Sequence, residues 1–316
     1  MKASLLAGLV IGLVVAILIL YAAPPIDDFN PLNPYWNGFS DLISRLHAVE
    51  LSSLFDENLL LNPSNTSLLI AGPEKEFSED EVRIIERFLR SGGQVIIADD
   101  FGSGNQLLEL LGVDVRFNGS LLVDPLFKER SMRLPRIRVM TLGVRELVFN
   151  YGTILEGCPN PIARSSSYSF LDLDLDGKWS EGEPRGPFAT ACFLSLGRGK
   201  LIIVADSSLW INSMFQMEDN QEFLKSLIGG RAVLIDGSHW ELSSLTMAKR
   251  ALSMMSSYIA SPELRYALIA LAVVVLVRYR RRRRAEESEV EKVLMRNPTW
   301  DRGLLIKLER EMKGER

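Results

Sequence analysis

The sequence predicts an α/β domain, because strands and helices alternate along the chain in two places. Residues 67–105 read as strand, helix and strand, with two short apolar runs at 68–70 and 95–97 on either side of an amphipathic segment. Such a unit joins two parallel strands through a right-handed crossover. The alternation returns later in the chain, with three strands and one helix at 188–196, 201–205, 232–235 and 219–227. This pattern is typical of a layered sheet covered by helices.

The helix of the first unit has clear signals at both ends. Ser78 followed by Glu81 has the spacing of a capping box, and Gly92 with Gly93 ends the helix. The strands after residue 137 are expected to form an antiparallel extension, whereas 118–137 shows no strong period. Weaker signals predict helices at 38–46, 105–111 and 242–258, and strands at 49–51, 113–117, 137–140, 146–150 and around 162–163.

Two apolar stretches predict membrane-spanning helices. Residues 3–23 form a run without a charge, about 30 Å long as a helix, for which a cleavable signal peptide is the alternative. Residues 266–277 are followed by six arginines that resemble a cytoplasmic stop signal, and a buried core helix is the alternative. The predicted segments are an N-terminal anchor (1–23), a linker (24–37), an α/β domain (38–260), a second transmembrane helix (261–279) and a basic, amphipathic tail (280–316).

This division predicts a cell-membrane protein that contacts lipid, with both termini cytoplasmic and the α/β domain outside. Acidic residues outnumber basic ones in that domain, and the whole chain carries a net charge of −4, which argues against nucleic acid as a partner. The amphipathic stretch 302–312 is expected to bind a partner or to lie on the inner leaflet.

Cys158 and Cys192 are the two cysteines of the chain. Both fall in the domain assigned to the outside, where a disulfide can form. Two separate buried thiols are the alternative, because spacing alone cannot pair cysteines. Asn65 and Asn118 each begin a glycosylation sequon.

Four segments together resemble the domain-of-unknown-function 4350 family. They are WNGFSDL at 36–42, LLIAGP at 68–73, FSEDEVRIIERFLRSGGQVIIADDFGSGN at 77–105, and GPFATACFLSLGRGKLIIVADSSLWINSMFQMEDNQEFLKSL at 186–227. The resemblance implies a flavodoxin-like sheet, similar to class I glutamine amidotransferase-like folds, in membrane-anchored archaeal and bacterial proteins. It also implies a cytoplasmic MoxR-type ATPase as a possible partner of residues 285–316, and it brings no established activity.

The wider amidotransferase-like group places a nucleophilic cysteine in a tight turn between strand and helix, and this chain departs from that pattern. Cys192 lies within a predicted strand, and Cys158 precedes a proline. Gly102-Ser103-Gly104 is not a nucleophile elbow either. The sequence therefore favours a noncatalytic binding or scaffold protein of a membrane complex. The alternatives are a hydrolase that uses Asp99, Asp206 or His239 as acid or base, and a ligand-binding sensor.

The sharpest local motif is DLDLDGKWSEGE at 172–183, which matches a calcium-binding loop. Calcium needs several oxygen ligands that converge on one point, and alternate carboxylates in a turning loop provide them. Gly177 stands where that loop turns. No flanking helices are predicted, so the loop would lie between strands and bind Ca²⁺ in a structural role, with an acidic surface loop as the alternative. The predicted metal-binding residues are Asp172, Asp174, Asp176, Lys178 and Glu183.

Polar residues also gather where the predicted parallel strands end. In an open parallel sheet these ends converge on a crevice in which ligands bind. Caps and turns are the alternative role for such residues. The candidates for the crevice are Asp99, Asp100, Gly102, Gly104, Asn105, Asp206, Ser207, Asn212, Asp236 and His239.

Overall fold

The structure is a computed structural model that describes residues 2–140 and 143–312. Residues 1 and 313–316, which belong to the first and last predicted segments, lie outside the described residues. The chain divides into two compact units, Met1–Met247 and Ala248–Arg316. The first unit contains the sheet and is described first.

Five parallel strands form one half of the main sheet. Strands β2 and β3 are buried along their whole length, which explains why each reads as a continuous apolar run and not as an alternating one. In spatial order the parallel strands are β1 (Val49–Leu51), β13 (Ala232–Asp236), β2 (Thr66–Ala71), β3 (Gln94–Ala98) and β12 (Gly199–Val204). The prediction of a mixed α/β fold with a large sheet is confirmed.

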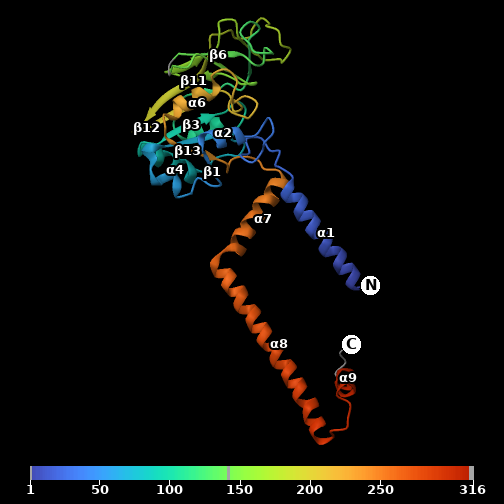
Figure 1. Ribbon diagram of the computed structural model, residues 1–316. Coiled ribbons are helices and arrows are strands. Elements are labelled where there is room, and N and C mark those ends of the chain that lie inside the picture. The colour runs from blue at the N-terminus through green and yellow to red at the C-terminus, as the bar shows by residue number, and fades with distance from the viewer. Residues whose placement is uncertain (1, 141–142, 313–316) are drawn as a thin grey trace. The chain divides into compact units, whose positions relative to one another are not determined.

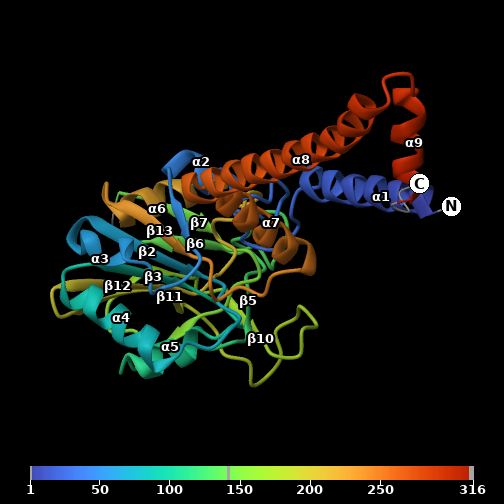
Figure 2. The ribbon, with the colours of Figure 1, turned by 90° about the horizontal axis from the view of Figure 1, so that it is seen from below.

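Helices cover both faces of this parallel half. Helix α4 (Glu79–Arg90) links β2 to the adjacent β3, and α6 (Asn220–Ile228) links β12 to β13 in the opposite direction across the sheet. Right-handed crossovers that run in opposite directions place their helices on opposite faces. Figure 2 shows this arrangement, with α4 and α5 (Gly104–Leu110) on one face and α6 on the other.

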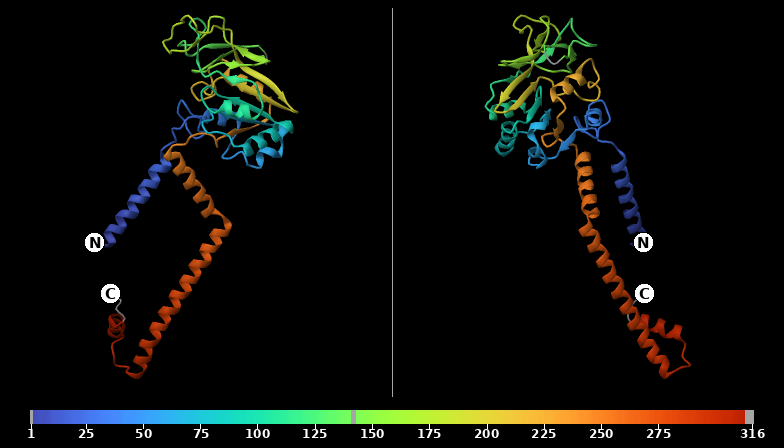
Figure 3. Two further views of the ribbon diagram at one scale, coloured as in Figure 1. Left: turned by 180° about the vertical axis from the view of Figure 1, so that it is seen from behind. Right: turned by 60° about the vertical axis from the view of Figure 1, so that its left-hand side comes forward.

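An antiparallel extension continues the sheet beyond β12, as expected. Figures 1 and 3 show its strands, coloured green to yellow, together at one end of the sheet. A disulfide joins Cys158 to Cys192 of β11, so the open question of cysteine pairing is resolved. Strands β5 and β10 form a separate pair, and β5 lies in the segment where no period was evident. The strands are β11 (Ala189–Leu196), β9 (Pro161–Arg164), β6 (Arg136–Val139), β7 (Glu146–Val148), β8 (Leu155–Glu156), β4 (Arg116–Phe117), β5 (Leu121–Val123) and β10 (Phe170–Asp172).

The proline- and asparagine-rich segment 24–37 packs against the domain. Asn33 is fully buried, and its side chain donates to Asp27 O at 2.8 Å and to Asn37 Oδ1 at 2.9 Å. Asn212 donates from its side chain to Asn33 O at 3.1 Å and to Tyr35 O at 2.6 Å. The segment that was expected to be a linker is thus packed as part of the folded domain. The other helices of this unit are α1 (Lys2–Ala22), α2 (Ser40–Leu46), α3 (Asn58–Leu61) and the 3-10 turn η1 (Pro63–Asn65).

Helix α7 (Ser244–Ala260) crosses the boundary into the second unit, which continues with α8 (Pro262–Arg296) and α9 (Arg302–Met312). Over the described residues, no single helix has both the length and the apolar character needed to cross a membrane. The segments Ser244–Tyr258 and Pro262–Arg282 meet these requirements only as a pair, bent by 66°.

The predicted transmembrane helices at 1–23 and 261–279 are therefore wrong. Within α8, the apolar run 266–277 is shorter than the roughly 20 residues that a bilayer requires, and arginines follow it at once. Helix α8 is long enough, but its apolar stretch reaches the required length only together with residues of α7, across a sharp bend. Helix α1 does not meet both requirements over its described residues.

Candidate functional site

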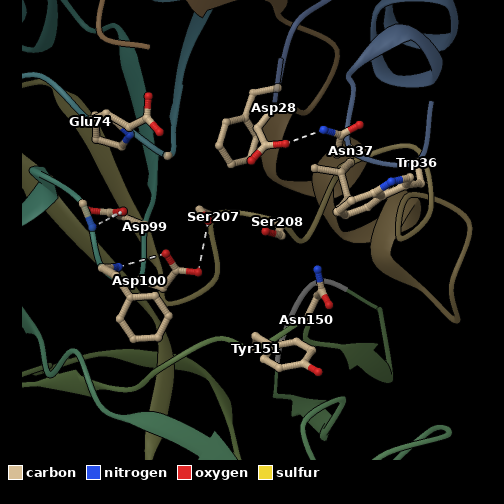
Figure 4. A pocket seen from close by; sticks show the side chains of 16 residues that line it. Asp28, Trp36, Asn37, Glu74, Asp99, Asp100, Asn150, Tyr151, Ser207 and Ser208 are labelled. Carbon is tan, nitrogen blue, oxygen red and sulfur yellow. Dashed lines mark hydrogen bonds between the residues drawn. The ribbon is translucent and has the colours of Figure 1, made fainter. Parts of the chain in front are cut away.

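A pocket of about 490 Å³ lies at the carboxyl ends of β2, β3 and β12. We call it the strand-end pocket. Figure 4 shows Asp99 and Asp100 on one side, Asp28 and Trp36 across from them, and Ser207 between. The sixteen lining residues are Asp28, Phe29, Trp36, Asn37, Gly72, Pro73, Glu74, Asp99, Asp100, Phe101, Gly102, Asn150, Tyr151, Ser207, Ser208 and Ile211.

Asp99, which directly follows β3, and Asp206, two residues after the end of β12, hold the turns behind the pocket. Asp99 is 1% exposed, and its two carboxylate oxygens accept from the backbone N–H groups of Gly102 at 3.1 Å and Gly104 at 2.7 Å. Asp206 is fully buried and accepts from the backbone N–H groups of Asn150 at 2.6 Å and Ser208 at 2.8 Å. Both side chains therefore fix loop conformation.

Burial changes the acidity of these carboxyl groups. It raises the pKa of Asp99 to about 6, and the nearby negative charge of Asp100 adds to the effect. Burial also raises the pKa of Asp206 well above its ordinary value, again assisted by Asp100. The pKa of Asp100 itself is raised, with burial as the largest cause. Burial thus favours the protonated form of all three neighbouring carboxyl groups, Asp99, Asp100 and Asp206.

Asp100 is the strand-end carboxylate that faces the pocket. Its Oδ1 accepts from the backbone N–H of Phe101 at 2.9 Å, and its Oδ2 accepts from Ser207 Oγ at 3.1 Å. The carboxylate is partly exposed, in contrast to Asp99 and Asp206. Asp100 is therefore the predicted strand-end carboxylate that a ligand can reach.

The opposite wall comes from the segment 24–37. Asp28 accepts a hydrogen bond from the Asn37 side chain, and the Trp36 indole beside it is 66% exposed. Phe29 has a left-handed backbone, with φ of 59°, and its ring lies against Gly72, where an added Cβ would come within 2.3 Å of the ring. Gly72 is thus required for this packing. Strained backbone of this kind concentrates at functional sites.

The floor of the pocket contains a second left-handed residue, Tyr151, with φ of 58°. Tyr151 is 47% exposed, and Phe101, which also lines the pocket, is 57% exposed. Aromatic rings that remain open to solvent in a concave site are available to stack on a ligand. The pocket therefore offers aromatic faces beside carboxylates.

Several predicted crevice residues do not line the pocket. Gly104 and Asn105 begin α5, where the Asn105 side chain pairs with the backbone of Phe117 at 2.9 and 2.8 Å. Asn212 anchors the segment 24–37, as described above. Asp236 and His239 lie at the end of β13, where His239 Nδ1 meets Asp236 Oδ2 at 2.5 Å.

His239 is enclosed by the protein. It is 3% exposed, its ring stacks on Phe77 with centroids 3.7 Å apart, and its backbone carbonyl accepts from Glu74 and Lys75. Asp236 also accepts from Ser238. These contacts give His239 a structural role just beyond the carboxyl end of β13.

Sequence reasoning missed twelve of the sixteen lining residues, because only Asp99, Asp100, Gly102 and Ser207 were predicted. Asp28, Trp36 and Asn37 lie in the segment expected to be a linker, and Asn150 with Tyr151 follows β7 of the extension. Such residues reach the pocket through long-range folding, which no local pattern encodes. Trp36 had one signal, because it begins the WNGFSDL segment that carries part of the family resemblance.

The raised pKa of Asp99 predicts a pH dependence of stability. Below its ordinary 3.8 both folded and unfolded chains hold the proton, whereas between 3.8 and about 6 mainly the folded chain does. The stabilisation present at low pH is therefore lost as the pH rises through about 6. Between about pH 5 and 7.5, this group should lower the free energy of unfolding by about 1.5 kcal/mol.

Urea unfolding of the wild type and Asp99→Asn at both pH values measures this contribution. The amide retains one acceptor but does not titrate, so the variant should lose less stability than the wild type as the pH rises. Equal pH dependence in the two proteins would show that Asp99 keeps an ordinary pKa.

The fold and the pocket define an α/β domain with an acidic, aromatic pocket at its strand ends. The family model described as "Domain of unknown function (DUF4350)" matches residues 31–228, and the chain belongs to this family. The family resemblance is therefore confirmed. The amidotransferase-like fold that it implied stays a prediction.

Comparison with curated proteins gives no match. Among solved structures, the chain is similar to the mmIFT52 N-terminal domain, with 18% identity, 56% of this chain and 81% of that chain covered, and a TM-score of 0.42. It is also similar to the exo-beta-1,4-mannosidase Op5Man5 from Opitutaceae bacterium strain TAV5. The identity is 13%, the match covers 52% of this chain and 24% of that chain, and the TM-score is 0.26. A third similar structure is the GH42 beta-galactosidase Gan42B. The identity is 15%, the match covers 55% of this chain and 23% of that chain, and the TM-score is 0.28. At these TM-scores no argument rests on the likenesses.

Proposed function

We propose that this protein is a noncatalytic recognition protein whose strand-end pocket binds an organic cation. The observation that carries the proposal is the composition of the pocket. Its described lining has four carboxylates and no lysine, arginine or histidine. The carboxylates are Asp28, Glu74, Asp99 and Asp100, and the aromatic residues are Phe29, Trp36, Phe101 and Tyr151.

Carboxylates and aromatic rings attract a cation in complementary ways. An ammonium or guanidinium group pairs with a carboxylate through charge-assisted hydrogen bonds. The face of Trp or Tyr attracts the same group through its quadrupole, by about 0.5–2 kcal/mol according to how dry the site is. An anionic ligand would meet only like charge from the ionised side chains. The pocket composition therefore favours amines, guanidines and quaternary ammonium compounds.

The cation has two possible sources, a free small molecule or a lysine or arginine side chain on a partner protein. The second source accords with a scaffold role in a complex. A MoxR-type ATPase that binds residues 285–316 remains a prediction for that role, resting on family analogy alone.

The states of the candidate cysteine, carboxylate, histidine and serine side chains support a noncatalytic role. Cys158 and Cys192 form a disulfide, so neither supplies a thiolate. Asp99 and Asp206 hold backbone turns, and His239 lies outside the pocket lining. Ser207 donates to Asp100 at 3.1 Å, but the described lining has no histidine to act as its base.

Isothermal titration calorimetry on the full chain tests the proposal. Choline, spermidine and the amides of N-acetyl-lysine and N-acetyl-arginine are the cationic probes, and 3,3-dimethylbutanol is the neutral analogue of choline. At least one cation should bind, and the neutral analogue should not. Tight binding of spermidine or choline would indicate a free ligand, whereas preference for the amino-acid amides would indicate a partner side chain.

Variants of the pocket locate the binding. Trp36→Ala should weaken it about five- to thirtyfold through loss of the ring face. Asp100→Asn should weaken it about tenfold or more, because the amide keeps the Ser207 contact without the charge. Glu109 is an exposed carboxylate outside the pocket lining, so Glu109→Gln is the matched control and should not change the affinity for the cation. Equal affinity for choline and its neutral analogue would contradict cation recognition.

A hydrolase is the second candidate, favoured by the raised pKa of Asp99. A carboxyl group with a pKa of about 6 beside a second carboxylate is a feature of acid–base sites. The hydrolase hypothesis predicts turnover of chromogenic esters, glycosides or peptides that Asp100→Asn abolishes in a folded protein. Asp206→Ala is a poorer test, because Asp206 also holds the Asn150 turn.

A further inference from the structure

The acidic loop 172–183 lies outside the strand-end pocket lining and has a different chemistry. It leaves the sheet at the end of β10, which pairs with β5, as Figure 2 shows. Leu171 N–H donates to Pro184 O at 3.1 Å, and Phe170 bridges to Arg185, so the two ends of the loop are held together. A closed loop of this kind can bring separate side chains to one point.

Three carboxylates converge inside the loop. Asp172, Asp174 and Asp176 each place an oxygen within 4.8 Å of the others. Asp174 Oδ1 accepts from Asp176 N–H at 3.2 Å, and Asp176 Oδ1 accepts from Lys178 N–H at 2.6 Å. These bonds orient the two exposed side chains and use one oxygen of each.

Asp172 provides the second, independent observation. It is 1% exposed, and its Oδ2 accepts from Gly177 N–H at 3.1 Å. Its Oδ1 is buried and has no hydrogen-bond partner. An unsatisfied buried carboxylate oxygen is costly, and a bound cation is one arrangement that satisfies it. The orphaned atom belongs to the same carboxylate cluster.

Glu183 closes the loop from the other end. Its Oε1 accepts from Leu173 N–H at 2.8 Å, and its Oε2 accepts from Ser180 N–H at 2.8 Å. The carboxylate therefore lies between the two arms of the loop. Each oxygen retains a free lone pair after one hydrogen bond, so Glu183 remains able to bind a cation.

We propose that Asp172, Asp174 and Asp176, with Glu183, bind a calcium ion that stabilises this loop. Position 7 of the loop, Lys178, contributes its backbone carbonyl in the pattern that such loops follow. The donors are all oxygens on a flexible loop, which suits Ca²⁺ better than Mg²⁺, because Mg²⁺ demands near-ideal octahedral geometry. The cation also removes repulsion among the clustered carboxylates.

Trp179 gives a direct optical probe of the site. Its indole N–H donates to the backbone carbonyl of Glu183 at 3.0 Å, so the ring is held to the last residue of the proposed site. Terbium, which replaces calcium at oxygen sites, should show luminescence sensitised by Trp179, and calcium should displace it. Trp179→Phe should lose most of that signal while keeping the calcium affinity.

Thermal unfolding of the full chain in excess EDTA or in calcium measures the stabilisation. At about 100 times the dissociation constant, calcium should raise the melting temperature by about 5 °C or more, with a smaller shift for the same concentration of magnesium. Asp172→Asn and the double variant Asp174→Asn/Asp176→Asn should each weaken calcium binding about 100-fold. Glu181→Gln removes an exposed charge at a non-ligand position of the same loop and should bind calcium like the wild type.

The double variant keeps the test sound if Asp172→Asn fails to fold, because Asp174 and Asp176 are exposed. A melting temperature that calcium does not change, or a calcium shift that survives the double substitution, would overturn the proposal. The cation probes of the strand-end pocket do not enter this test, so the two proposals can fail separately.

Discussion

Replacing Trp240 by alanine should lower the free energy of unfolding of the domain by about 4 kcal/mol. The indole is 2% exposed and packs against Phe29 and Phe39, with ring centroids 6.3 and 6.1 Å away. Its Nε1–H donates to Ala71 O at 2.8 Å. The substitution would leave a large cavity and would also remove the donor from a buried carbonyl at the end of β2.

The same substitution should disturb the strand-end pocket. Phe29 and Phe39, whose centroids are 5.3 Å apart, attach the segment 24–39 to the sheet through Trp240. Asp28 and Trp36 are carried by that segment, and Phe29 packs on Gly72. Loss of the indole should therefore weaken cation binding as well as stability.

Urea unfolding followed by circular dichroism measures the change. Trp240→Phe keeps a ring but loses the N–H donor, so it should cost less than the alanine variant. Trp300→Ala is the control for removing an exposed tryptophan, since that indole belongs to a residue that is 53% exposed. A loss below about 1 kcal/mol in Trp240→Ala would mean that the aromatic cluster does not hold the segment.

The parallel half of the sheet could be predicted because its signals are local. Strands β2 and β3 are apolar throughout, and the Ser78–Glu81 capping box is complete, with Ser78 N–H donating to Glu81 Oε2 at 2.8 Å and Glu81 N–H donating to Ser78 Oγ at 3.4 Å. Strand β5 was missed because it has three residues and pairs with β10 far along the chain. The two transmembrane helices were predicted from local apolar composition, but over the described residues no single helix has both the length and the apolar character needed to cross a membrane.

The candidate site could be predicted in position but not in detail. The rule that parallel strand ends converge identifies the neighbourhood of Asp99, Asp100 and Ser207. It does not say that Gly102 and Gly104 bind the Asp99 carboxylate, which leaves Asp100 to face the pocket. In the acidic loop the carboxylates recur at fixed spacing within twelve residues, so a local pattern was enough to single them out, and oxygens of Asp172, Asp174 and Asp176 lie within 4.8 Å of one another.

Removing the disulfide should cause the second large loss of stability. The Cys158–Cys192 bond closes a loop with a sequence separation of 34 and joins the segment after β8 to β11. In the chain-entropy model, a loop of this length restricts the unfolded state by about 4 kcal/mol. Cys158→Ser combined with Cys192→Ala should lower the free energy of unfolding by about that amount, and alanine suits the buried position 192.

Reduction of the wild-type protein separates the covalent bond from the packing of the sulfur atoms. A thiol reductant should destabilise the wild type nearly as much as the double substitution does, and it should leave the double variant unchanged. If the effect of the variant were instead due to lost packing, the reduced wild type would keep its stability. Titration of thiols in the unreduced, unfolded wild type should find none, and two titratable thiols would contradict the bond. The disulfide therefore restrains the segment after β8 against β11, and β11 in turn pairs with β12 of the parallel strands.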